Sequence, residues 1–307
     1  MRDSFENVPA EPQRVEERPT LEEARAWCRE LTSSPSENFR VALFFLPKRL
    51  RTHFECLYAY RRVLADLVGE TADPQAALRV LRSWQGMLDE CYDAPERSMH
   101  PVFVALRETI VEFDLPRILF LDLVRGFQLD EVRPVCQTWE ELLEYSHHSA
   151  NSVGRLVLLL CGYREEELAL LSDKFCTALQ LANLWQDVVE DAERGRRYIP
   201  EESLVRFGVD EGQIEGRVFT LEFRAMMQEL VTRTRAMLLE GGAISGRVDP
   251  ELAVTLDLFR KGGEAILDEI VAQDYDVLRG RPVVTKVKKL SLLAGALMSK
   301  ARMGFSR

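Results

Sequence analysis

The sequence predicts an all-α protein, and three observations support this class. Apolar residues recur at intervals of three and four along most of the chain, whereas convincing strand alternation bounded by turn residues is absent from the sequence. Glycine and proline stand mainly between these periodic segments, where helices are expected to end. Hydrophobic residues make up 46% of the 307 positions, which is enough for a large core.

The predicted helices follow one another without a linker, an internal repeat or a low-complexity tract. Residues 1–19 are rich in proline and charge, so we expect a disordered tail there and a single helical domain over 20–307. Thr20, Asp73 and Thr138 are the expected N-caps of three helices, and a short apolar helix is expected before Pro47. After a first helix beginning at Leu21, the predicted helices span about 49–70, 74–92, 99–113, 116–128, 138–161, 164–193, 219–241, 250–277 and 284–303.

Charge and cysteine usage exclude several classes of protein. The formal net charge of −10 disfavours a nucleic-acid-binding protein, which would present a basic surface. The six cysteines are scattered singly without a CxxC pair, so we interpret them as reduced thiols rather than disulfides or metal ligands. The polar N-terminus does not resemble a signal peptide, and the longest apolar runs are too short to span a bilayer. These features predict a cytoplasmic protein.

The most informative stretch runs from Ala178 to Pro200. In a helix, Gln180, Asn183, Asp187 and Asp191 fall on one face, because three, four and four residues separate them. Apolar residues cover most of the remaining surface, which is typical of a helix in the interior of a large domain. The single polar stripe is therefore predicted to face an internal pocket.

Asp187 and Asp191 would need a cationic partner in such a place. Burying ionised carboxylates without one is costly, and the partner could be arginine or a hard cation. Oxygen and amide donors without neighbouring histidine or cysteine suit Mg²⁺, which commonly binds one or two carboxylates and a substrate phosphate. The alternative, a solvated acidic helix face or a purely structural helix, leaves the polar stripe among apolar residues unexplained.

The segment from Asn183 to Val209, NLWQDVVEDAERGRRYIPEESLVRFGV, resembles the second aspartate-rich motif of the squalene and phytoene synthase family. In that family a DxxxD helix is followed by a basic turn, a Tyr-(Leu/Ile)-Pro stop and an acidic helix start, and all these pieces occur here in order. The resemblance extends over roughly residues 20–300. It implies the isoprenoid synthase fold, with about ten helices around a central apolar cavity.

The first aspartate-rich motif of the family is only partly present. Tyr58, Arg62 and Asp66 are spaced by four as in the family, with Arg61 beside them, but Ala65 and Gly69 replace two of the aspartates. The resemblance implies that Asp66 joins Asp187 and Asp191 as a metal ligand. It also implies that the two arginines bind diphosphate, for which guanidinium groups are well suited.

Two further elements match the family. Tyr145, Ala150, Val153 and Gly154 fit its Tyr-x-x-x-x-Ala-x-x-Val-Gly element, in which small residues would leave room for a prenyl chain. Near the C-terminus, Arg281 is expected to contact diphosphate. The resemblance thus implies substrate binding by a set that spans the chain: Tyr58, Arg61, Asp66, Ala150, Gly154, Gln180, Asn183 and Arg281. It implies catalytic roles for Arg62, Tyr145, Asp187 and Asp191.

Within the family, the HSAN run at 148–151 and the FRKGG run at 259–263 most resemble the hydroxysqualene synthase branch of the hopanoid pathway. This resemblance implies a Mg²⁺-dependent enzyme that ionises presqualene diphosphate and quenches the cation with water. No nucleotide-binding glycine motif occurs in the sequence, so NADPH is not expected. One alternative is head-to-head condensation of two farnesyl diphosphates. Another is a non-catalytic protein that binds prenyl lipid and partners a synthase, which the losses at Ala65 and Gly69 would favour.

The C-terminal segment suggests a further partner. From Lys286 to Arg307 it has six basic residues and no acid, with Leu290, Leu292, Leu293, Leu297 and Met298 between them. Such a helix could lie on the anionic inner face of a membrane. The alternative is a docked final helix with a solvated basic face. Besides prenyl diphosphate and this membrane contact, we expect other hopanoid-pathway enzymes as partners, and no nucleic acid.

Overall fold

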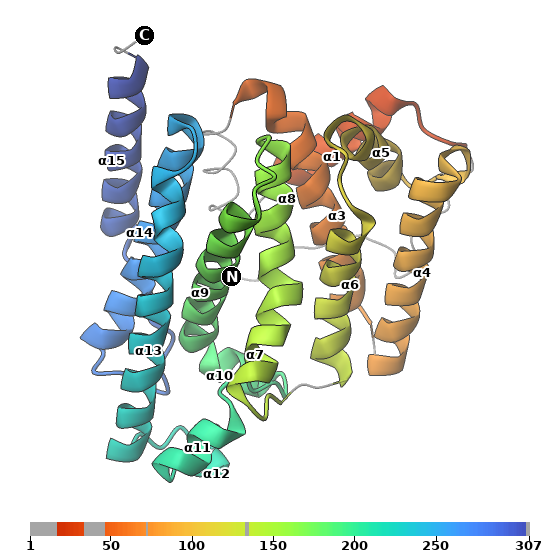
Figure 1. Ribbon diagram of the computed structural model, residues 1–307. Helices are drawn as coiled ribbons and strands as arrows, with labels where there is room; N and C mark the ends of the chain where they lie inside the picture. Colours follow the sequence, from red (N-terminus) through yellow and green to blue (C-terminus); the bar gives the residue numbers. More distant parts are fainter. Residues whose placement is uncertain (1–16, 34–46, 72, 133–134, 305–307) are drawn as a thin grey trace. The chain divides into compact units, whose positions relative to one another are not determined.

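The computed structural model describes residues 17–33, 47–71, 73–132 and 135–304, and these residues are predominantly α-helical (Figure 1). Within these ranges there is no β-strand; one isolated bridge joins Val135 and Arg197. The all-α class is therefore confirmed. Most of the predicted N-terminal tail and the apolar helix expected before Pro47 lie outside the described residues. None of the described helices has the length and apolar character required to cross a membrane.

The helices fall into two compact units. The first contains the chain up to Val132 and the stretch Leu156–Tyr163, and the second contains the rest, so that α8 begins in the second unit and continues into the first. The elements of the first unit are α1 (Leu21–Ser33), η1 (Lys48–Leu50), α3 (Arg51–Gly69), α4 (Pro74–Asp93), η2 (Pro95–Arg97), α5 (Pro101–Phe113) and α6 (Arg117–Val132). The expectation of a single domain over 20–307 stays a prediction.

The second unit contains the longest helices. Its elements are α7 (Trp139–Ser146), η3 (His147–Asn151), the start of α8 (Ser152–Leu160), α9 (Glu166–Gln186), α10 (Val188–Glu193), α11 (Glu201–Phe207), α12 (Glu211–Glu215), α13 (Leu221–Gly242), η4 (Ala243–Gly246), α14 (Pro250–Ala272) and α15 (Lys286–Gly304). The two short helices α11 and α12 were not predicted as separate elements.

Aromatic packing fixes α3 at the centre of the first unit. Tyr60 is fully buried, and its ring lies 5.2–5.9 Å from those of Trp84, Phe103 and Phe120. The Tyr60 hydroxyl donates to the carbonyl of Phe120 at 3.1 Å, which satisfies its polar atom inside the core. Because Tyr60 points inward, the neighbouring positions that carry Tyr58 and Arg62 are held at the less buried side of α3.

Polar and close contacts hold α9 against α13 in the second unit. The indole of Trp185 donates to Thr234 Oγ1 at 2.7 Å, and both side chains are completely buried. At Gly241 of α13, a Cβ would lie only 2.4 Å from the backbone nitrogen of Phe175, so the two helices approach closely there. α14 packs on both helices. These contacts fix the C-terminal end of α9, which carries the polar stripe.

The predicted N-caps are confirmed. The hydroxyls of Thr20 and Thr138 accept from the backbone N–H groups three residues on, at 3.3 and 3.2 Å, and the Asp73 carboxylate does so at 2.8 Å. In α1, Glu23 also accepts from the Thr20 backbone at 2.8 Å, which completes a capping box.

Three predicted helices differ from the structure. The helix expected at 138–161 contains a π-helical turn at His147–Asn151, and the helix expected at 164–193 breaks at Asp187. The backbone of Asp187 leaves the helical region, with φ −103° and ψ 16°. The helix expected at 250–277 ends at Ala272, because Asp274 and Tyr275 take positive φ angles.

Candidate active site

The polar stripe lies at the junction of α9 and α10. Leu184, Trp185, Val188 and Val189 are buried, as the apolar pattern predicts. Gln180, Asp187 and Asp191 are half-buried, whereas Asn183 is exposed. The hydrogen bonds from Asp187 N to Asn183 O (2.9 Å) and from Asp191 N to Asp187 O (2.8 Å) continue across the bend. The two carboxylates therefore remain one turn apart although the helix is not straight.

Asp187 has an arginine partner. The Nε atom of Arg281 donates to Asp187 Oδ1 at 2.5 Å, and its Nη2 donates to Gln186 Oε1 at 2.9 Å. Gln186, which is buried, in turn donates through Nε2 to the carbonyl of Pro282. Three bonds thus fasten the segment at Arg281 and Pro282 to the end of α9.

Of the two partners that the sequence left open for Asp187, the structure shows the arginine. The side chains of Arg281 and Asp187 are 42% and 30% exposed, so this is a water-accessible ion pair. Such pairs contribute little stability, about 1 kcal/mol or less. A divalent cation with a bound phosphate could therefore replace the arginine at the carboxylate at small cost.

Gln186 was not among the predicted site residues. Its side chain lies on the buried side of the helix, away from the stripe formed by Gln180, Asp187 and Asp191. The available signal was a lone amide among the apolar residues that precede Asp187. Since a buried amide must be hydrogen-bonded, that position indicates a tertiary partner, although it does not indicate which one.

The basic turn after α10 is partly structural. Arg197 is 8% exposed and its guanidinium bonds Glu201 at 2.6 Å, Glu211 at 3.0 Å and the carbonyl of Ile199 at 3.0 Å. This arginine orders the loop that leads into α11 and α12. A cavity of about 10 Å³, room for about one water, lies beside Asp191 and is bordered by this turn.

Tyr145 lies near the same turn. It is largely buried, and its ring centroid is 4.9 Å from that of Tyr198, which belongs to the Tyr-Ile-Pro sequence. The structure therefore brings together two tyrosines that are more than fifty positions apart in the sequence. Ala150 lies in the π-helical turn and is half-buried.

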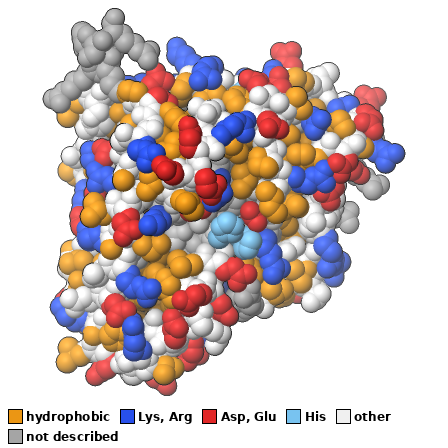
Figure 2. Space-filling view, in the orientation of Figure 1, with side chains coloured by type: hydrophobic (Ala, Val, Ile, Leu, Met, Phe, Trp, Pro, Cys, Tyr) orange, Lys and Arg blue, Asp and Glu red, His pale blue; other side chains and the backbone are white. Residues whose placement is uncertain are grey.

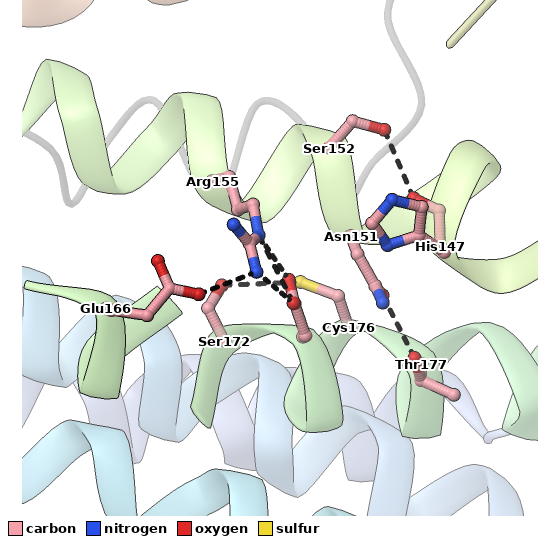
Figure 3. Close-up of polar contacts among 9 residues, drawn as sticks. His147, Asn151, Ser152, Arg155, Glu166, Ser172, Cys176 and Thr177 are labelled. Atoms are coloured by element: carbon pink, nitrogen blue, oxygen red, sulfur yellow. Dashed lines mark hydrogen bonds and ion pairs between the residues drawn. The ribbon is translucent and has the colours of Figure 1, made fainter. Parts of the chain in front are cut away.

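The π-helical turn connects α7 to α8 and is secured by side chains (Figure 3). The N–H of Ser152 bonds the His147 carbonyl five residues back, and its hydroxyl donates to the carbonyl of His148 at 2.7 Å. Asn151 is buried, and its Oδ1 accepts from Thr177 Oγ1 of α9 at 2.9 Å. Since such wide turns are often found at functional sites, this one is a notable feature of the predicted Tyr145–Gly154 element.

Contacts between α8 and α9 satisfy the upstream part of the polar stripe. Arg155 binds Asp173 through bonds of 2.7–3.2 Å and reaches Glu166 at 3.4 Å (Figure 3). Asp173, Thr177 and Gln180 share one face of α9 because four and three residues separate them. Arg155 therefore neutralises the acidic group at the N-terminal part of this face. The C-terminal part of the same face carries Asp187 and Asp191.

Gly154 occupies the point where α8 meets α9. A Cβ at this position would be 2.5 Å from both Ser172 Oγ and Cys176 Sγ. Burial raises the pKa of the Cys176 thiol to about 12, so this cysteine is a neutral packing residue. The small residue is required here by helix packing, which is an alternative to its predicted role in making room for substrate.

The predicted residues of the first motif lie on α3 in the first unit. Arg62 Nε donates to both carboxylate oxygens of Asp66, at 2.9 and 2.7 Å, and this hydrogen bonding raises the pKa of Arg62. Tyr58 is half-buried one turn before, and Arg61 is exposed. The structure thus pairs the arginine with the one aspartate that remains of this motif.

The residues present fit a magnesium ion. Asp187 and Asp191 offer carboxylate oxygens one turn apart, and both are accessible to solvent. Hard oxygen donors of this kind suit Mg²⁺, which keeps several waters and readily shares a phosphate ligand. Arg281 adds a cation that could pass from carboxylate to phosphate.

Comparison with known proteins identifies the family and agrees with the helical fold. A sequence model described as squalene/phytoene synthase matches residues 32–288. The chain belongs to the squalene/phytoene synthase family, and it is an enzyme of that type. Among curated relatives, 15-cis-phytoene synthase of Synechococcus elongatus is 29% identical over 95% of this chain and 97% of its own length. Phytoene synthase 2 of Solanum lycopersicum is 27% identical, covering 89% of each chain.

Solved structures confirm the isoprenoid synthase fold. The crystal structure of squalene synthase HpnC from Alicyclobacillus acidocaldarius aligns with a TM-score of 0.79 at 38% identity, over 83% of this chain and 95% of that one. A dehydrosqualene synthase structure aligns with a TM-score of 0.78 at 24% identity, covering 92% and 98% of the two chains. The predicted central apolar cavity stays a prediction.

Proposed function

We propose that this enzyme ionises presqualene diphosphate and lets water quench the rearranged cation, giving hydroxysqualene and diphosphate. The observation that carries the proposal is the resemblance of the HSAN and FRKGG runs to the hydroxysqualene branch. The 38% identity to squalene synthase HpnC, compared with 27–30% for the phytoene synthases, supports an enzyme of squalene formation and is equally compatible with condensation. The substrate, the product and the metal requirement are all parts of this proposal.

The residues at the α9–α10 junction suit departure of a diphosphate. Asp187 and Asp191 would hold Mg²⁺, which supplies positive charge to the leaving group when bound. Arg281 is bonded to Asp187 and tethered through Gln186, so if Mg²⁺ occupied the carboxylate the guanidinium would be placed to donate to phosphate oxygens. The carbon–oxygen bond breaks with both electrons going to the diphosphate, so these cations stabilise the charge that develops.

The loss of two aspartates from the first motif favours a reaction that ionises a single diphosphate. Ala65 and Gly69 provide no carboxylate, and Asp66 is bonded to Arg62. We expect a reaction that starts from one diphosphate to require fewer metal ligands than one that joins two. Arg62 and Arg61 could then contribute to binding as guanidinium groups without metal.

Head-to-head condensation of two farnesyl diphosphates is the second candidate. The squalene synthase neighbour supports this candidate, and the phytoene synthases, which match nearly the whole chain at 27–30% identity, support condensation as a reaction class without indicating farnesyl diphosphate as the substrate. In that case the same carboxylates and Arg281 would serve the first ionisation as well.

Product analysis distinguishes these functions. The purified protein is incubated with Mg²⁺ and either presqualene diphosphate or farnesyl diphosphate, and lipid products are identified by mass spectrometry. We expect hydroxysqualene from presqualene diphosphate and no condensation of farnesyl diphosphate. Products from farnesyl diphosphate would support the second candidate. No product from either substrate, in a protein that binds them, would support the non-catalytic alternative.

A further inference from the structure

The last helix, α15, has two different sides. It packs against α14, as Figure 1 shows at the dark blue end of the chain. On its inner side, Leu292 and Ala296 border a cavity of about 300 Å³ that Val254 and Leu258 of α14 also line. Two of the leucines that the sequence suggested for membrane contact, Leu292 and Leu293, are only half-exposed.

The opposite side of α15 is apolar and exposed. Val287, Leu290, Leu297 and Met298 are 77%, 66%, 46% and 59% exposed, with Ala294 exposed among them. Positions 287, 290, 294 and 298 recur at intervals of three and four, so these side chains form one stripe along the helix. We call Val287, Leu290, Ala294, Leu297 and Met298 the outer face.

The charged side chains that α15 itself carries are all basic, although one of them, Lys288, lies 3.5–3.6 Å from Asp268 and Glu269 of α14. The sequence contains no acidic residue after Asp276, although the whole chain carries a net charge of −10. Acidic and basic side chains are interspersed over the face of the molecule seen in Figure 2. On α15, in contrast, Lys286, Lys288, Lys289 and Lys300 are the charged residues up to position 301, and Lys286 is exposed at the helix start.

We propose that the outer face of α15 lies in the headgroup region of an anionic membrane. An amphipathic helix with apolar residues on one side and lysines at its margins binds such a surface through both contributions. A second copy of the chain suits this face less well, because pairing two outer faces would bring lysines of like charge together. This proposal does not depend on which lipid diphosphate the enzyme uses.

Vesicle binding by the full-length protein tests the proposal. Sedimentation is measured with vesicles of equal parts phosphatidylcholine and phosphatidylglycerol, and with phosphatidylcholine alone. We expect binding to the anionic vesicles that weakens with added salt. The double variant Leu290→Gln/Met298→Gln should bind about tenfold more weakly or worse, because two inserted apolar side chains are lost.

A matched variant tests whether losing any two exposed apolar side chains, outside the outer face, also weakens vesicle binding. Leu239 on α13 and Val205 on α11 are 72% and 71% exposed, and Leu239→Gln/Val205→Gln should bind as the unaltered protein does. Lys286→Gln removes one exposed charge without touching the outer face, and it should weaken binding to anionic vesicles about fivefold.

Three outcomes would overturn the proposal. The first is absence of vesicle binding by the unaltered protein. The second is equal binding by the outer-face variant and its control. The third is a dimer of the unaltered protein in light scattering that Leu290→Gln/Met298→Gln converts to a monomer, which would identify the outer face as a contact between copies.

Discussion

Arg281 is the cationic side chain that pairs with the Asp187 carboxylate in the candidate site. Its guanidinium donates to the Asp187 carboxylate and to the side-chain oxygen of Gln186. The same arginine is predicted to contact the diphosphate, so it cannot serve both partners fully at once. Binding of a metal to Asp187 and of diphosphate to Arg281 should therefore occur together.

Replacing Arg281 should change the affinity for Mg²⁺ alone and the affinity for diphosphate in opposite directions. In Arg281→Ala, Mg²⁺ alone should bind about fivefold more tightly, because the competing ion pair is gone. Inorganic diphosphate with Mg²⁺ should bind about 10- to 100-fold more weakly, because charge-assisted hydrogen bonds are lost. Titration calorimetry measures both affinities.

The control for this prediction is Arg279→Ala. Arg279 is exposed in the same segment, and its backbone N–H bonds Asp276 at 3.1 Å without help from its side chain. That variant should leave both affinities unchanged. If Arg281→Ala leaves the affinity for Mg²⁺ alone unaltered, the competition between arginine and metal does not exist.

Among the elements, the approach of α8 to α9 depends on Gly154. Gly154→Ala should lower the free energy of unfolding by about 1–3 kcal/mol, because the new Cβ would overlap Ser172 Oγ and Cys176 Sγ. Adding Ser172→Ala and Cys176→Ala should restore much of this loss. Denaturant titration measures each step.

A second glycine provides the matched comparison. Gly262 lies within α14 and has no atom near its Cβ position, so Gly262→Ala should raise the free energy of unfolding by about 0.5–1 kcal/mol. Equal responses of Gly154→Ala and Gly262→Ala would show that α8 and α9 do not meet as described.

The start of α5 should respond to pH. His100 is buried beside Trp27 and Trp84, and its Nδ1 accepts from the N–H of Val102 at 3.2 Å, which requires a neutral ring. Burial lowers the pKa of His100 to about 4, below the value near 6.5 expected in the unfolded chain. As pH falls below about 6.5, the unfolded state binds a proton that the folded state does not, so stability is lost.

Between pH 7 and pH 5 this histidine should reduce the free energy of unfolding by about 2 kcal/mol. His100→Asn keeps a capping acceptor and removes the titrating group. Between pH 7 and pH 5, the free energy of unfolding of this variant should therefore fall by about 2 kcal/mol less than that of the unaltered protein. Chemical denaturation at both pH values gives the two differences. The same pH dependence in both proteins would exclude His100 as the cause.

At the scale of the whole molecule, helical class and most helix positions followed from local patterns. Apolar periodicity and the capping residues Thr20, Asp73 and Thr138 are encoded within a few positions of each helix start, and the structure has them as expected. The break at Asp187 could not be predicted in this way. A bent and a straight helix share the same spacing of Asp187 and Asp191, so the sequence pattern does not separate them.

The site was predictable only where neighbours in sequence are neighbours in space. The residue types at Asp187 and Asp191 indicated a need for a cation. The pairing of Asp187 with Arg281 spans 94 positions, and the choice of partner depends on how α9 and the segment before α15 pack. Gln186 likewise acquires its role from Arg281 and Pro282, which local periodicity does not reveal. The resemblance suggested Arg281 as a diphosphate contact, but it did not suggest its bond to Asp187.

The central claim is that Asp187 and Asp191 together hold a magnesium-bound diphosphate. The most direct measurement is the affinity for inorganic diphosphate, by calorimetry, with Mg²⁺ and with EDTA. The unaltered protein should bind tightly only with Mg²⁺, and Asp187→Asn should lose about tenfold or more of that affinity. Equal affinity with and without Mg²⁺, or unaltered magnesium-dependent binding by Asp187→Asn, would contradict the account.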